Sequence, residues 1–143
     1  MGGGDFTQLP DSMFEINQIL PKSDGKYYYS KKANMAYPRH GHSCCALGEN
    51  HIVVTGSRKD FQKAPFRTEL YNISEDRWID LQPIHNGRHY HSSCTFDQDR
   101  IYIFCGISNE TKKYLNTIER LYINPQNIHL SQRNSWEVLN VSD

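Results

Sequence analysis

Short runs of β-branched, aromatic and small apolar residues alternate along the chain with polar or glycine-containing breaks. Runs of this length and composition predict β-strands. The first group lies at 42–47, 51–55, 68–72 and 78–81, and the second lies at 91–96, 100–105, 117–122 and 136–139. No window shows a sustained helical period with capping residues. The pattern therefore predicts an all-β protein with two groups of four strands.

The two groups of strands belong to an internal repeat. Residues 39–45 recur as residues 88–94, with five of the seven residues identical. The repeat continues through the second strands, where 52–56 aligns with 102–106, and through the pairs Glu69 and Glu119, and Trp78 and Trp136. The second unit is longer because it contains a polar segment, 124–135, which is predicted to be a loop. A unit of about 50 residues with four strands is typical of a β-propeller blade.

The repeated residues resemble the kelch motif, which combines Arg-x-x-His-Ser, a strand that ends in two glycines, a Glu-x-Tyr strand and a Trp strand. The matching positions in the first unit are His42, Gly56, Glu69, Tyr71 and Trp78, and those in the second are His91, Gly106, Glu119 and Trp136. The second unit has Leu121 in place of the tyrosine. The second glycine of the pair is Ser57 in one unit and Ile107 in the other. The resemblance implies a partial kelch-type β-propeller with four-stranded antiparallel blades.

The repeat divides the chain into one partial propeller domain with three parts. Residues 1–38 are interpreted as an incomplete first blade, because 13–17 matches the third strand and Tyr29 matches Trp78. Residues 39–87 form the second blade and residues 88–143 the third. Propellers usually have about four to eight blades. We therefore expect this chain to be part of a longer propeller, or to complete its ring with another chain.

Composition and charge exclude several classes of function. The 143 residues include 16 Lys and Arg and 16 Asp and Glu, so the formal net charge is zero. This balance argues against a nucleic-acid binder or a polybasic membrane anchor. No apolar run is long enough to span a bilayer, and the N-terminus lacks a signal-peptide pattern. The sequence therefore predicts a cytoplasmic protein with reduced cysteines.

Histidine and cysteine occur twice in the pattern His-x-His-x-x-Cys, a combination that can bind zinc. The first copy contains His40, His42 and Cys45. On an extended strand the two histidines share a face and Cys45 lies on the other. The repeat itself accounts for the pattern, so the prediction is that there is no metal site and no cofactor. Cys45 and Cys94 are interpreted as buried apolar packing, with a disulfide or a Cys/His nucleophile as the alternatives.

Four residues are candidates for contact with a partner. The resemblance implies that Arg39 and Arg88 lie in the loops between successive blades, on the face that kelch domains use to bind peptides. An arginine there can hold a carboxylate with two hydrogen bonds. The loop after the second strand emerges on the same face and supplies Arg58 in one unit and Asn109 in the other. The alternative is that Arg39 and Arg88 brace the blade junctions through backbone carbonyls.

The resemblance implies a function of one general kind, a non-catalytic platform for protein–protein interactions, whose partner the sequence does not identify. The chain has none of the common phosphate-binding or hydrolase motifs. One alternative is an enzyme of kelch architecture, similar to the copper oxidases or sugar-acid epimerases. Another is a purely structural subunit of a larger complex.

Overall fold

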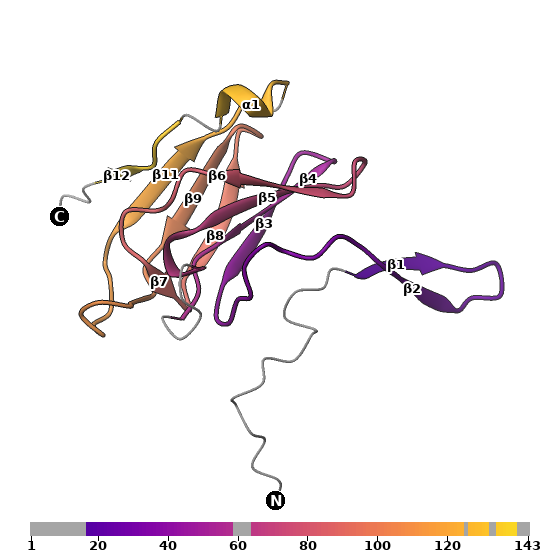
Figure 1. Ribbon diagram of the computed structural model, residues 1–143, viewed down its shortest axis with the longest axis horizontal. Coiled ribbons are helices and arrows are strands. Elements are labelled where there is room, and N and C mark those ends of the chain that lie inside the picture. The colour runs from indigo at the N-terminus through magenta and orange to yellow at the C-terminus, as the bar shows by residue number, and fades with distance from the viewer. Residues whose placement is uncertain (1–16, 59–63, 125, 132–133, 140–143) are drawn as a thin grey trace, which may run out of the picture.

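The computed structural model describes residues 17–58, 64–124, 126–131 and 134–139. Two four-stranded antiparallel sheets lie side by side (Figure 1). Sheet I has the order β3 (Ser43–Leu47), β4 (His51–Thr55), β5 (Thr68–Asn72) and β6 (Arg77–Leu81). Sheet II has the order β8 (Ser92–Phe96), β9 (Arg100–Phe104), β11 (Ile118–Tyr122) and β12 (Glu137–Leu139). The all-β prediction, with antiparallel four-stranded blades, is confirmed.

Other elements are short. The 3-10 turn η3 (Ala64–Phe66) precedes β5, and the four-residue helix α1 (Ile128–Ser131) lies in the segment predicted to be a long loop. Two-residue strands β7 (Arg88–His89) and β10 (Ile107–Ser108) pair with each other beside sheet II. In the described part of the chain, no helix has the length and apolar character needed to cross a membrane.

An N-terminal hairpin joins β1 (Asn17–Pro21) to β2 (Tyr27–Lys31). Figure 1 shows it extending away from the two sheets. Tyr29 lies in β2 as predicted, and its register partner is Ile19. Of the strand expected at 13–17, only Asn17 belongs to the described residues, and the glycines at 2–4 also lie outside them. The boundary between residues 1–38 and the second blade remains a prediction.

The hydrophobic core lies between the two sheets. Neighbouring strands of sheet I bring Val53, Leu70 and Ile79 into register on one face. These side chains belong to the same buried cluster as Ile103 and Leu121 of sheet II. The inner strands also meet directly, because the hydroxyl groups of Ser43 and Ser93 are 2.6 Å apart. The complete cluster comprises Leu47, Val53, Leu70, Ile79, Leu81, Ile84, Ile101, Ile103, Leu121, Ile123 and Trp136.

The strand register corrects the predicted alignment of the second strands. Ser43 pairs with Thr55 in sheet I and Ser92 pairs with Phe104 in sheet II, so Phe104 takes the place of Thr55. The offset here is therefore 49 residues, and a shift of one residue exchanges the two faces of a strand. Cys105 takes the place of Gly56, since both have left-handed backbones, with φ values of 56° and 66°.

The double-glycine position in the second unit is consequently Cys105-Gly106, and the predicted pairing of Gly106 with Gly56 is wrong. The residues at the first position make equivalent hydrogen bonds. Gly56 N donates to the oxygen of Arg67, just before β5, and Cys105 N donates to that of Thr117, just before β11. The misalignment arose because the sequence comparison matched glycine with glycine. The actual match places a cysteine in a conformation that glycine adopts more easily.

Candidate functional site

One edge of the two sheets is built from the turns that join them. We call it the turn edge and define it as residues 39–42, 56–58, 88–91 and 105–113. Its backbone connects the sheets, because Ser57 N donates to Arg88 O at 3.0 Å and Tyr90 N donates to Gly41 O at 2.7 Å. The strand β7 lies at the lower end of the two sheets in Figure 1. All four predicted partner-contact residues belong to this edge.

Arg39 is buried within the turn edge, with only 1% of the residue exposed. Its Nη2 is 2.7 Å from Oε2 of Glu69, and its Nε donates to the same oxygen at 3.1 Å. Nη1 donates to the backbone oxygens of Gly56 and Arg67, at 2.9 and 3.0 Å. Burial lowers the pKa of Arg39, while the Glu69 carboxylate opposes that shift. The guanidinium therefore joins two strands of sheet I to the preceding turn.

Arg88 makes an equivalent ion pair and equivalent backbone contacts in sheet II, although its Nε donates to Asn86 O rather than to the carboxylate. Its guanidinium is fully buried and forms an ion pair with Glu119. Nη1 donates to the backbone oxygens of Cys105 and Thr117, at 3.0 and 3.3 Å. Burial lowers its pKa also, and Glu119 again opposes the shift. The two arginine–glutamate pairs, which we call braces, are therefore repeated structural features of the chain.

Each glutamate of a brace also holds the segment before its arginine. Oε1 of Glu69 accepts a hydrogen bond from Ala36 N at 2.8 Å. Oε2 of Glu119 accepts one from His85 N at 2.7 Å. Both guanidinium groups are thus enclosed, with no exposed surface for a partner's carboxylate. The structure places Arg39 and Arg88 in the bracing arrangement that the sequence left open as the alternative.

Asn109 is also buried, with 2% of the residue exposed. Its Nδ2 donates to Ser57 O at 2.8 Å, and its backbone N donates to Gly87 O at 2.9 Å. The amide group therefore connects the turns of sheets I and II. Arg58 is partly exposed, and its backbone N donates to His40 O at 2.9 Å. Of the four predicted contact residues, Arg58 is the one that reaches the surface.

The two motif histidines have different surroundings. His91 is buried between the sheets, and its Nε2 lies 2.8 Å from the hydroxyl of Thr55 in the preceding sheet. Burial, together with the nearby Arg88, lowers the pKa of His91 to about 3. Its Nδ1 is buried without a hydrogen-bond partner among the described residues. His42 is exposed. Sheet I provides Thr55 as the neighbour of His91. By the repeat, a sheet preceding sheet I would provide the equivalent neighbour of His42.

The aromatic motif residues fasten the outer strands. Trp78 Nε1 donates to Ala33 O at 2.8 Å, and Trp136 Nε1 donates to Gln82 O at 3.0 Å, so the two tryptophans hold equivalent segments. Trp136 is almost fully buried, whereas Trp78 is half-buried. The Tyr71 ring lies 5.0 Å from that of Trp78, and burial raises the pKa of Tyr71 to about 12.

The cysteines are all free thiols. Cys45 is half-buried, and burial raises its pKa to about 11. Cys94 is exposed, so the prediction that it is buried is wrong. It lies on the outer face of sheet II, which no other sheet of the described chain covers. Within the described ranges, no three His, Cys, Asp or Glu side chains are placed so that they could hold a metal ion.

Tyr90 is a feature of the turn edge that the motif comparison missed. It occupies the place of Gly41 in the repeat, and 57% of the residue is exposed. Its ring lies 4.9 Å from that of His89 and 6.1 Å from that of His40, with edge-on geometry in both cases. The signal in the sequence is that Tyr90 differs from Gly41 although the residues on either side are identical in the two units.

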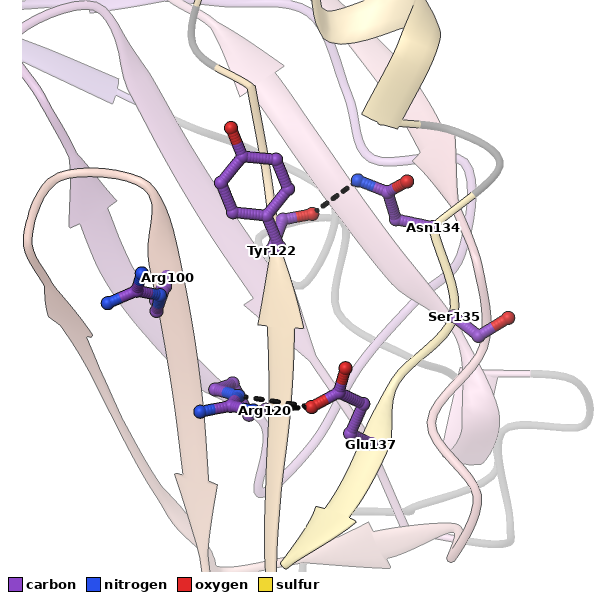
Figure 2. Close-up of a pocket in the computed structure, with 6 residues that line it drawn as sticks. All are labelled: Arg100, Arg120, Tyr122, Asn134, Ser135 and Glu137. Carbon is purple, nitrogen blue, oxygen red and sulfur yellow. Dashed lines mark hydrogen bonds and ion pairs between the residues drawn. The ribbon is translucent and has the colours of Figure 1, made fainter.

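A second surface feature is a hollow of about 640 Å³ on the open face of sheet II (Figure 2). The pair Arg120–Glu137 spans two strands here, at 2.6 Å. Nearby, Asn134 Nδ2 donates to Tyr122 O at 2.9 Å. The lining residues are Arg100, Arg120, Tyr122, Asn134, Ser135 and Glu137. The hollow is shallow, polar and partly neutralised by its own ion pair, so the turn edge remains the candidate site.

Two stacked four-stranded sheets with matching braces and a strand order that runs inner to outer define the blades of a β-propeller. Residues 38–85 match the family model described as Kelch motif. This match supports a kelch-repeat relationship, and kelch motifs generally mediate protein–protein interactions and are generally non-catalytic. A search of curated proteins found no match.

Proposed function

We propose that this chain is a non-catalytic platform for protein–protein interactions, and that the turn edge is its binding surface. Within this proposal Arg58 contacts the partner directly, whereas Arg39, Arg88 and Asn109 hold the turns in place. The partner is a protein, and neither nucleic acid, membrane nor cofactor takes part. The competing functions are an enzyme of kelch architecture and a purely structural subunit.

The observation that carries the proposal is the pair of buried braces beneath the turn edge. Arg39–Glu69 and Arg88–Glu119 make equivalent contacts, each to backbone oxygens of two strands. Binding residues commonly lie on loops that a rigid scaffold positions. Because the braces fix the backbone of the turns through several hydrogen bonds, the side chains of the turns can hold one arrangement in solution. A preorganised surface of this kind loses less conformational entropy when it binds.

The test is affinity capture from native extract followed by mass spectrometry, with two single-residue variants compared with the wild-type chain. Arg58→Glu reverses a charge at the turn edge, and Arg77→Glu reverses one on β6, away from that edge. We expect a set of proteins captured by the wild type and by Arg77→Glu to be lost with Arg58→Glu. Equal capture by all three chains would contradict the assignment of the surface.

The enzyme alternative has its own check. A metal assay of the purified chain and a turnover screen should both be negative if the platform proposal holds. A stoichiometric metal ion, or turnover that survives purification to homogeneity, would favour the enzyme instead.

A further inference from the structure

The repeat places Tyr90 and Gly41 at the same position in successive units. Both residues follow the Arg-His pair that the two units share, at an offset of 49 residues. Both have a left-handed backbone, with φ values of 54° for Tyr90 and 67° for Gly41. Glycine adopts this conformation without strain, whereas a bulky side chain does so at a cost in stability. The first unit therefore has an unstrained residue, Gly41, at this position, whereas the second unit has Tyr90, which is strained.

The tyrosine obtains little burial in return. More than half of Tyr90 is exposed, at 57%. A side chain that packs poorly and strains the backbone does not stabilise the fold, so stability does not explain why tyrosine stands at this position. Residues held in sparsely populated backbone regions cluster at binding and active sites, where the surrounding structure fixes them. The departure from glycine thus points to a role for the aromatic ring at the surface.

The surrounding residues hold that ring in one place. Tyr90 N donates to Gly41 O at 2.7 Å, and the rings of His40 and His89 flank the tyrosine at 6.1 and 4.9 Å. Gly41 leaves room for it, because a Cβ at that position would lie 2.8 Å from Tyr90 Cε1. A rigid, exposed aromatic ring is the type of residue that dominates binding energy at protein interfaces. Little conformational freedom remains to be lost when a partner covers it.

The charges along the turn edge indicate the kind of partner. Its exposed and partly exposed charged side chains are the cations Arg58, Lys112 and Lys113 and the anion Glu110, an excess of positive charge. Complementary charge raises association rates and selects against partners of the wrong sign.

We propose that Tyr90 is the anchor through which the turn edge binds an extended acidic segment of a partner protein. The aromatic ring provides the apolar contact, and Arg58, Lys112 and Lys113 provide the attraction for carboxylates. This inference rests on the proposed function of the turn edge and adds to it the chemical class of the partner. It also assigns the specific contact to a residue that is not one of the repeated motif residues.

The first experiment separates a binding role from a packing role. Tyr90→Gly restores the residue found at the equivalent position in the first unit. We expect a melting temperature equal to or higher than that of the wild-type chain, because the left-handed strain is removed. A clear fall in melting temperature would show that the ring is needed for packing, and it would overturn the proposal.

The second experiment measures binding with a synthetic array of 12-residue peptides in three compositions: rich in Asp and Glu, rich in Lys and Arg, and neutral. We expect the wild-type chain to prefer the acidic peptides, and Tyr90→Gly to weaken that binding at least about tenfold. Tyr90→Phe keeps the ring and should retain binding within about threefold. The control Tyr122→Ala removes an exposed tyrosine from the open face of sheet II, and should change nothing.

The outcomes distinguish this inference from the proposed function. Binding of acidic peptides that is insensitive to Tyr90→Gly, a preference for basic or neutral peptides, or no binding at all would overturn the inference. If proteins captured by the wild-type chain are still lost with Arg58→Glu, the turn edge remains a binding surface with a different anchor. If capture is also insensitive to Arg58→Glu, the proposed function fails as well.

Discussion

Arg39 and Arg88 have similar surroundings, and their burial decides whether they bind a partner or stabilise the fold. Arg39 and Arg88 have the side chain expected of a carboxylate-binding contact, and each does bind a carboxylate. That carboxylate belongs to Glu69 or Glu119 of the same sheet, and the guanidinium groups are fully buried. Removing one partner of a buried pair leaves an uncompensated charge, which destabilises strongly. At the residue scale the braces are therefore structural.

Substitution of Arg88 by alanine tests this assignment. We expect a loss of about 3–5 kcal/mol in the free energy of unfolding, because the Glu119 carboxylate stays buried without its partner. The matched control is Arg77→Ala, which breaks an exposed pair with Glu75 and should cost less than about 1 kcal/mol. Chemical denaturation of both variants gives the comparison. A stable Arg88→Ala variant that only binds more weakly would show that Arg88 is a contact residue.

His91 makes stability depend on pH. Its pKa is about 3 in the folded chain, below the ordinary value of 6.5 that applies when the chain is unfolded. Between these values the unfolded chain binds the additional proton. The contribution of neutral His91 to stability is thus complete above pH 6.5 and is lost as the pH falls towards 3. The slope reaches about 1.4 kcal/mol per pH unit.

The measurement compares the wild-type chain with His91→Gln, which keeps a polar group beside Thr55 but does not titrate. Unfolding free energies between pH 4 and pH 7 should converge as the pH falls, since only the wild type loses the histidine contribution. Parallel curves for the two chains would contradict the buried, neutral state of His91.

At the scale of elements, the two tryptophans anchor equivalent strands with unequal burial. Trp136 is packed against sheet I and only 2% exposed, whereas Trp78 is half-buried. We expect Trp136→Ala to cost about 3–5 kcal/mol and Trp78→Ala to cost less. Thermal or chemical unfolding of the two variants checks the order. The reverse order would mean that the sheet preceding sheet I covers Trp78 more completely than these contacts show.

The strands could be predicted because their composition differs from that of the breaks. The ranges 51–55 and 68–72 coincide with β4 and β5, and the other strands of both sheets differ by one residue at their ends. The two-residue strands β7 and β10 could not be predicted, because they form where two turns meet beside sheet II. The same is true of the helix α1, whose single turn carries no periodic pattern.

The candidate site was harder to predict than the fold, for two physical reasons. A one-residue difference in backbone path moved Cys105 into the position of Gly56, and sequence identity favoured the wrong glycine. In addition, residue type does not reveal which side chains are enclosed. The sequence brought Arg88 and Asn109 to the correct edge, but their burial depends on contacts with residues about 17 to 52 positions away.

At the scale of the whole molecule, the two sheets have unequal faces. The face of sheet I that carries Val53 and Leu70 is covered by sheet II. The corresponding face of sheet II carries Tyr102 and Arg120 at those positions. Phe96 and Tyr122 on the same face are 60% and 46% exposed. Such a face is the surface on which a further blade would pack, either from the same protein or from another chain.

We predict that these sheets are blades of a propeller that the 143 residues do not close by themselves. The measurement is light scattering on the purified 143-residue chain, combined with binding of the dye ANS. We expect the chain to self-associate or to bind ANS through the open face of sheet II. A monomer that melts cooperatively and binds no ANS would contradict the claim.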